Sequence, residues 1–295
     1  MTSAHEPVMV AEVLELLQPS RGGRFVDCTT GLGGHSRALL DGGATHLIGL
    51  DRDLSALAIA RETLARFGDR VELVHADYRE LDRVLDERGV ERSAGILADL
   101  GVSSMQFDAE GRGFSFRRDE PLDMRMDQSR GPSVADLLRD VEETELADVI
   151  YQFGEERASR RVARAIVAAR RESPIDTTGR LAAIVRRSVP HHGHQRIDPA
   201  TRTFQALRIW VNRELEGLDT FLALAAGRLL ANARLAVITF HSLEDRIVKH
   251  TFRAMEKAGE GLRILTKRPL VPADDEVTRN PRARSAKLRA IERLA

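Results

Sequence analysis

The sequence predicts an α/β fold in which an open, mostly parallel sheet is interrupted by an all-helical insertion. Over the first hundred residues, short β-branched runs alternate with helical stretches, in the rhythm of consecutive βαβ units. After Gly101 the pattern changes to a loop rich in Gly, Arg and Asp and then to helices, and strand-like residues return only at 234–242. The predicted domains are therefore 1–105 together with 216–295, and an inserted 106–215.

Individual elements follow from hydrophobic periodicity and from Gly and Pro breaks. Four strands are expected at 24–29, 46–51, 71–77 and 94–100, with helices after the first three that end near residues 40, 67 and 88. The insertion is expected to hold a loop at 106–131 and helices at 133–150, 155–172, 178–188 and 202–215. The last part is expected to form a helix at 216–230, a strand at 234–242, a helix at 243–255 and an antiparallel hairpin of 262–267 with 285–293.

Composition places the chain among globular proteins, since 42% of its 295 residues are hydrophobic. No run approaches the roughly 18 to 20 apolar residues of a membrane span, and the N-terminal residues lack the layout of a signal peptide. We expect a cytoplasmic protein that contacts no membrane. The single cysteine, Cys28, lies in the first predicted strand, which favours a packed core side chain over a reactive thiol.

Charge is unevenly distributed, although the formal net charge is zero. Residues 1–110 hold 11 Arg against 19 Asp and Glu, whereas 151–190 and 262–295 each hold nine basic residues against four acidic ones. Of the 45 basic residues 41 are Arg, whose planar guanidinium suits phosphates and stacked bases. The two basic segments are compatible with a nucleic-acid partner and equally with ordinary solvated helix faces.

An aspartate ends, or lies next to the end of, each of the four predicted strands: Asp27, Asp51, Asp77 and Asp99. In an open α/β sheet the ligand crevice lies at the carboxyl ends of the strands, so these four side chains should meet at one edge. A single such aspartate can also simply cap the following helix. Four of them together favour a binding site.

A glycine-rich turn at 27–35 follows the first strand and opens a helix, where backbone N–H groups can approach a carboxylate or phosphate. As a dinucleotide fingerprint it fails at its last position, which is Ser36. Asp51, 18 residues beyond Gly33, can accept hydrogen bonds from both hydroxyls of a ribose. The two features together indicate an adenosyl cofactor.

The third and fourth strands add groups for the base and for the reacting atoms. Asp77 can accept from an adenine amino group and Tyr78 offers a stacking face, although an aromatic after a strand is more often packed in the core. Asp99 lies beside the position that a transferred group should occupy. A carboxylate there can accept a hydrogen bond from a poorly nucleophilic amine, which raises the electron density on its nitrogen, and can then remove the proton.

Eight segments then identify a family. The chain resembles the MraW/RsmH family, bacterial 16S rRNA (cytosine-N4)-methyltransferases, along nearly its whole length. The matching segments are HEPVM at 5–9, TGLGGHS at 30–36, DLGVSS at 99–104, RGFSFRRDEPLDMR at 112–125, YQFGEER at 151–157, PATRTFQALRIWVN at 199–212, TFHSLEDR at 239–246 and NPRARS at 280–285.

The resemblance implies a Rossmann-like class I sheet that binds S-adenosyl-L-methionine, with the helical domain binding RNA. It also implies the partner, a cytidine in the decoding centre of 16S rRNA in the small ribosomal subunit; a homodimer is compatible with it. No D-P-P-Y tetrapeptide is present, so Asp99 in Asp99-Leu100-Gly101 is a hypothesis for the catalytic group. Carried over onto matching positions, the cofactor-binding residues are Gly33, Gly34, His35, Asp51, Tyr78, Asp99 and Gln106.

Two further groups of residues could contact RNA or the reacting base. Ser242 is expected to cap the helix after the fifth predicted strand, and His241 is a second candidate catalytic residue that faces the base across from Asp99. The segment 201–212 could pack through its apolar residues while its polar residues face RNA. Those polar residues are Thr201, Arg202, Arg208 and Asn212.

Two rival functions remain open at this stage: a nicotinamide-dependent oxidoreductase with the same crevice, and a non-catalytic RNA-binding module. Ser36, in place of the last glycine of the dinucleotide fingerprint, and the return of strands after residue 234 count against the oxidoreductase. The glycine turn and the four strand-end acids count against a module that only binds RNA. No metal is expected, because His191, His192 and His194 have no Cys or carboxylate partner at ligand spacing.

Overall fold

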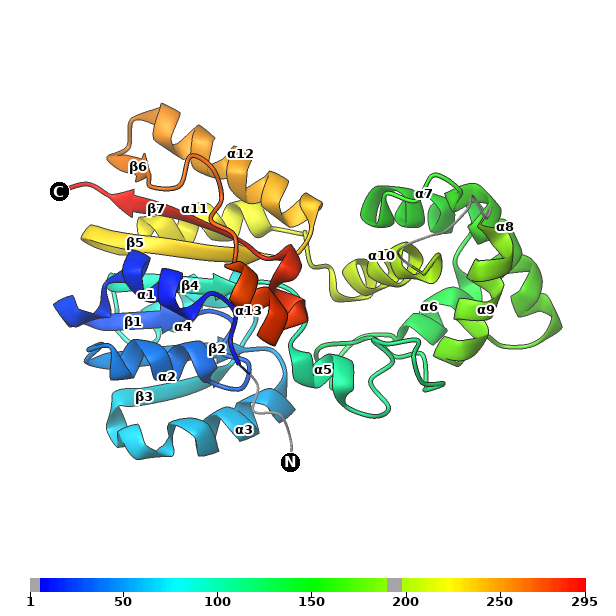
Figure 1. Ribbon diagram of the computed structural model, residues 1–295, viewed down its shortest axis with the longest axis horizontal. Coiled ribbons are helices and arrows are strands. Elements are labelled where there is room, and N and C mark those ends of the chain that lie inside the picture. Colours follow the sequence, from blue (N-terminus) through cyan, green and yellow to red (C-terminus); the bar gives the residue numbers. More distant parts are fainter. Residues whose placement is uncertain (1–5, 190–197) are drawn as a thin grey trace. The chain divides into compact units, whose positions relative to one another are not determined.

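The computed structural model describes residues 6–189 and 198–295, so His191, His192 and His194 lie outside the described residues. The chain forms two compact units (Figure 1). The first unit contains Met1–Gly101 and Leu215–Ala295, and the second contains Val102–Glu214. The first break follows Gly101, where the sequence pattern changes, and the two units are described in turn.

The first unit is built on a seven-stranded sheet in the order β3-β2-β1-β4-β5-β7-β6 (Figure 1). The strands are β1 (Arg24–Asp27), β2 (His46–Asp51), β3 (Val71–His75), β4 (Ser93–Asp99), β5 (Leu229–Thr239), β6 (Leu262–Ile264) and β7 (Lys287–Arg293). All neighbours are parallel except β7, which runs antiparallel to both β5 and β6. This sheet confirms the predicted α/β class with an open, mostly parallel, Rossmann-like sheet.

Both faces of the sheet are buried, which explains why its strands are almost continuously apolar. Successive residues belong to different cores: Phe25 and Leu47 pack in one cluster, whereas Val26 and Ile48 pack in the other. The helices of this unit are α1 (Val10–Leu17), α2 (Gly34–Asp41), α3 (Leu54–Leu64), α4 (Leu81–Asp86), α11 (Leu218–Gly227), α12 (Ser242–Ala258) and α13 (Asp274–Arg279).

The predicted bounds were least accurate at the ends of the elements. The predicted helix 216–230 ends at Gly227, and β5 begins at Leu229 rather than at 234. The closing antiparallel pair is confirmed, with Leu262 opposite Arg293. Helix α1 was not predicted, although its apolar residues recur at helical spacing.

The second unit is helical, as predicted, and its described residues have their own hydrophobic core. Its helices are α5 (Ser104–Asp108), α6 (Val134–Asp140), α7 (Glu143–Gly154), α8 (Ser159–Glu172), α9 (Thr178–Ser188) and α10 (Ala200–Asn212). The single helix predicted at 133–150 is two helices, because Val141 and Glu142 are extended, with ψ of 138° and 146°. Among the described residues, no helix in either unit is long and apolar enough to span a membrane.

Two polar residues of α10 face the protein and not solvent, so the prediction that they contact RNA is wrong. Asn212 is 8% exposed; its Oδ1 accepts from the Met126 N–H at 2.8 Å and its Nδ2 donates to the Met124 carbonyl at 2.7 Å. Arg208 forms a two-pronged ion pair with Glu214, at 2.9 and 2.8 Å. Helical spacing places both on the buried side of α10, whereas Arg202 is exposed.

Replacing Asn212 with Ala should lower the free energy of unfolding by about 2–4 kcal/mol, because the Met126 N–H and the Met124 carbonyl lose their partner inside the protein. Chemical denaturation, followed by circular dichroism, measures the change. The control is Asn232→Gly, at an exposed asparagine with φ of 61°, which should change stability by less than about 0.5 kcal/mol. Equal stability of the two variants would show that the Asn212 bonds contribute nothing.

Candidate functional site

The carboxyl ends of the parallel strands bring three aspartates to one edge of the sheet. Asp27, Asp51 and Asp99 are the last residues of β1, β2 and β4, and β1 pairs with both of the other strands. The strand order changes direction between β1 and β4, and this is where open α/β sheets bind ligands. Asp77 follows β3 by two residues.

The glycine turn connects β1 to α2 and contacts the end of β2. Gly33 precedes α2 with φ of +85°, a conformation that side chains rarely adopt, and no side chain caps this helix. The Gly31 N–H donates to Asp51 Oδ2 at 2.7 Å. Gly34 has another explanation, because a Cβ there would lie 2.9 Å from Pro7. The turn therefore offers an uncapped helix N-terminus beside a carboxylate, and a cofactor contact of Gly34 stays a prediction.

Asp51 is positioned to accept hydrogen bonds from a ligand. Its Oδ1 accepts from the Asp53 N–H at 2.8 Å and its Oδ2 from the Gly31 N–H, so each oxygen keeps a second lone pair. Burial raises the pKa of Asp51 to about 6, although those two N–H groups favour the charged form. A carboxylate held in this way fits the hydroxyls of a ribose, as the sequence predicts.

The affinity for S-adenosylhomocysteine should therefore fall as the pH drops through about 6, because protonation of Asp51 removes part of its capacity to accept. Above about pH 6 the carboxylate is charged and the affinity should be constant. Titration calorimetry between pH 5 and pH 8 measures this. Asp51→Asn, which cannot titrate, should bind more weakly and lose this step; a step that persists in Asp51→Asn would assign it to another group.

Asp77 and Tyr78 both contact other side chains of the protein. Asp77 caps the short helix after β3 and pairs with Arg52 at 3.1 Å and Arg79 at 2.8 Å. Burial alone would raise its pKa, but the hydrogen bonds from Arg79 and the charge of Arg52 lower it to about 2. The Tyr78 ring packs on Phe221, with 4.7 Å between the ring centroids. Capping therefore accounts for Asp77, and a cofactor contact of Tyr78 stays a prediction.

His35 lies at the N-terminus of α2 in the field of two acids, Asp27 and Asp99. Its Nε2 is 3.6 Å from Asp99 Oδ2, and both ring nitrogens are buried without a hydrogen bond in the described structure. Burial lowers the pKa of His35, but the two carboxylates outweigh it and the net shift is upward. Asp27 is fully buried and accepts from Ser36 Oγ at 2.7 Å.

Asp99 has more unused acceptor capacity than Asp51. Its Oδ1 is buried and has no hydrogen-bond partner among the described residues, while its side chain as a whole is 23% exposed. The Asp99 N–H donates to Thr29 Oγ1 at 2.6 Å, which fixes the end of β4 against the glycine turn. Sequence analysis missed Thr29, because no spacing rule links a hydroxyl to a backbone group 70 residues away.

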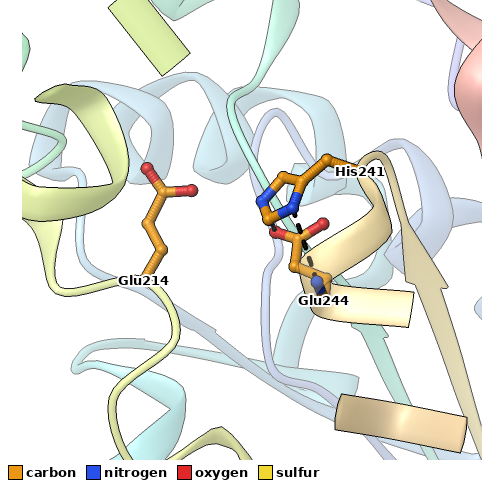
Figure 2. A group of neighbouring side chains, drawn as sticks. All are labelled: Glu214, His241 and Glu244. Atoms are coloured by element: carbon orange, nitrogen blue, oxygen red, sulfur yellow. Dashed lines mark hydrogen bonds and ion pairs between the residues drawn. The ribbon is translucent and has the colours of Figure 1, made fainter. Parts of the chain in front are cut away.

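His241 caps α12, so the predicted cap at Ser242 is wrong. Its Nδ1 accepts from the Glu244 N–H at 3.4 Å, and its Nε2 is 3.2 Å from Glu244 Oε1 (Figure 2). Glu244 in turn accepts from the Phe240 N–H at 3.0 Å. The His241 backbone is extended, with φ of −139° and ψ of 164°, which is why the helix begins after it. Its catalytic role stays a prediction.

Gln106 belongs to the second unit and is also part of a cap. Its Oε1 accepts from the Ser103 N–H at 3.0 Å, and its own N–H donates to Ser103 Oγ at 3.2 Å. This reciprocal pair closes the start of α5. A cofactor contact of Gln106 stays a prediction.

Cys28 is buried, and burial raises the pKa of its thiol, as expected for a packed residue.

Comparison with known proteins tests the predicted family. The family model described as the MraW methylase family matches residues 2–294. The chain is 51% identical to the ribosomal RNA small subunit methyltransferase H of Bradyrhizobium diazoefficiens, over 100% of this chain and 93% of that protein. It is 50% identical to the protein of the same name from Geobacter sulfurreducens, over 100% of both chains.

Among solved structures, the chain is similar to an rRNA methylase from Streptococcus thermophilus, with a TM-score of 0.42 and 11% identity over 97% of this chain and 94% of that one. The family match over nearly all residues excludes the nicotinamide-dependent alternative. The chain belongs to the MraW methylase family and is an S-adenosylmethionine-dependent methyltransferase.

Proposed function

We propose that this chain transfers a methyl group to the exocyclic N4 amine of a cytidine in the decoding centre of 16S rRNA. The observation that carries the proposal is full-length identity of about 50% to relatives named ribosomal RNA small subunit methyltransferase H. The choice of an amine nitrogen as the methyl acceptor rests on Asp99, because its unbonded Oδ1 can accept a hydrogen bond from an amine N–H. A cytoplasmic location and a homodimer remain predictions.

The first unit offers groups that fit S-adenosylmethionine. Asp51 keeps two acceptor positions for the ribose hydroxyls, and the uncapped N-terminus of α2 at Gly33 suits the carboxylate of the methionine moiety. His35 and Asp99 would lie at the methionine end. When bound, the cofactor supplies an electrophilic methyl group on a positively charged sulfur.

Asp99 would activate the amine. The lone pair on the cytosine amine is delocalised into the ring, and a hydrogen bond to a carboxylate raises the electron density on nitrogen. Asp99 Oδ1 is the acceptor for that bond, while Oδ2 faces His35 at 3.6 Å. After transfer the same carboxylate takes the surplus proton from nitrogen. In-line positioning supplies most of the remaining rate enhancement.

A base that is stacked in a helix cannot reach such a site, so the target cytidine has to be unpaired or turned out of the stack. The second unit is the part of the chain proposed to hold the RNA around it. Six arginines and no acidic residue occur between Arg157 and Arg171, which gives this unit a positively charged segment that favours phosphate.

The direct test is methyl transfer from labelled S-adenosylmethionine to purified small ribosomal subunits that lack the modification, with the product nucleoside identified by mass spectrometry. One N4-methylcytidine per subunit is the expected result. Methylation of another base or atom would leave a methyltransferase with a different substrate. Naked 16S rRNA as a parallel substrate shows whether the enzyme needs the assembled subunit.

A further inference from the structure

An exposed tyrosine and three arginines surround an open hollow on the second unit. The hollow has a volume of about 380 Å³ and is lined by residues from the end of α7 and the start of α8. Its lining residues are Tyr151, Arg157, Ala158, Ser159, Arg160 and Arg161. This volume is at the lower end of the range for small-ligand sites, the size of a single nucleotide.

Tyr151 is the most exposed large hydrophobic side chain among the described residues of this unit, at 59%. On the same helix, Ala147 and Ile150 are buried in the core of the unit, whereas Asp148, three residues before Tyr151, is exposed like Tyr151 itself. The tyrosine ring therefore contributes little to packing. An exposed aromatic ring beside a cationic surface is the arrangement on which single-stranded nucleic acids stack their bases.

The three arginines differ in whether they form an ion pair within the described part of the chain. Arg160 is 3.6 Å from Asp148, an exposed pair that costs little to break. Arg157 and Arg161 are exposed and have no acidic partner within 4.0 Å among the described residues. The opposite side of α8 is fixed in the core by Val162 and Ile166, so these guanidinium groups are held on a rigid helix end.

We propose that this hollow binds one nucleotide of a single-stranded RNA segment, with its base stacked on Tyr151 and the flanking phosphates on Arg157 and Arg161. The proposal rests on the proposed function, because the RNA is the substrate strand. Stacking and charge together favour RNA over an acidic peptide, which would use the arginines and leave the ring unused. Tyr151 and the arginines are positioning residues and touch no reacting atom.

Binding of a fluorescent single-stranded RNA of about 12 nucleotides tests this, with S-adenosylhomocysteine present. Tyr151→Leu should weaken binding by about 5- to 100-fold, whereas Tyr151→Phe should bind like the wild type because it keeps the stacking face. The double variant Arg157→Ala/Arg161→Ala should bind more weakly and reduce the slope of log K against log salt by about 1.4, or about 0.7 per phosphate. The control is Arg139→Ala, at an arginine of the same unit that is 68% exposed and paired with Asp136, and it should change binding by less than about twofold.

Kinetics on small subunits then separate this proposal from the proposed function. Tyr151→Leu should raise KM for the subunit with kcat and S-adenosylhomocysteine affinity unchanged. If the wild-type enzyme methylates subunits, and Tyr151→Leu and the double arginine variant behave like Arg139→Ala, the proposed nucleotide site is overturned and the proposed function is not. Wild-type enzyme that neither binds nor methylates RNA would overturn both proposals. If the double arginine variant binds RNA more weakly but Tyr151→Leu binds like the wild type, the stacking site is also overturned.

Discussion

Replacing Asp99 with Asn should lower kcat for methyl transfer by about 10²- to 10⁴-fold, the usual range for loss of a positioned acid–base group. The amide keeps the shape of the side chain but cannot take the proton, and it offers a donor where the amine N–H needs an acceptor. The measurement is single-turnover transfer to small subunits at saturating S-adenosylmethionine, with S-adenosylhomocysteine affinity determined alongside.

Affinity for the cofactor product decides how the Asp99 result is interpreted. A loss of turnover with affinity within about threefold of wild type supports a role in the chemical step. An equal loss of both would make Asp99 a cofactor-binding residue that acts with His35, 3.6 Å away. Asp41→Asn is the control, at a carboxylate of the same unit that is 51% exposed and should not affect turnover. Full activity of Asp99→Asn would exclude the catalytic role.

Replacing Asp51 with Ala should weaken S-adenosylhomocysteine binding by about 100-fold or more. Two hydroxyl hydrogen bonds to a charged acceptor contribute about 1.5–3 kcal/mol each. The substitution also leaves the Gly31 and Asp53 N–H groups without their acceptor, which loosens the glycine turn. Titration calorimetry on the apo protein gives the affinity directly.

A thermal unfolding experiment serves as the control for Asp51→Ala, because a ligand that binds only the folded state raises the melting temperature by mass action. Wild-type protein and Asp41→Ala should both be stabilised by S-adenosylhomocysteine, and NAD should stabilise neither. If Asp51→Ala is stabilised as much as the wild type at the same ligand concentration, Asp51 does not hold the cofactor.

The periodic features of this chain could be predicted from its sequence. Alternation of residues such as Phe25 and Val26 between the two faces of a sheet is a local pattern, and so are the glycine turn and the aspartate at the end of each strand. The family motifs are equally local, because each is a short run of consecutive residues. These features were enough to predict the fold class, the family and the cofactor.

Element ends were harder, because they depend on which hydrogen bond closes each helix. A serine at 242 is the stronger capping residue by preference, yet His241 caps α12, since its ring also meets Glu244. The split between α6 and α7 depends on two extended residues that lack a breaker such as Gly or Pro. Preferences of single residues are too small to decide such cases.

The order of residues is enough to predict that four acids follow strands of one mostly parallel sheet and that a glycine turn precedes a helix. The role of each acid depends on the residues that surround it in the folded chain. Asp77 pairs with Arg79 and with Arg52, which is 25 residues away, whereas Asp99 keeps an unbonded Oδ1 and its backbone N–H donates to Thr29, 70 residues away. The reason is physical: the free energy of a buried carboxylate depends on the charges and donors that surround it in space, and these come from distant parts of the chain.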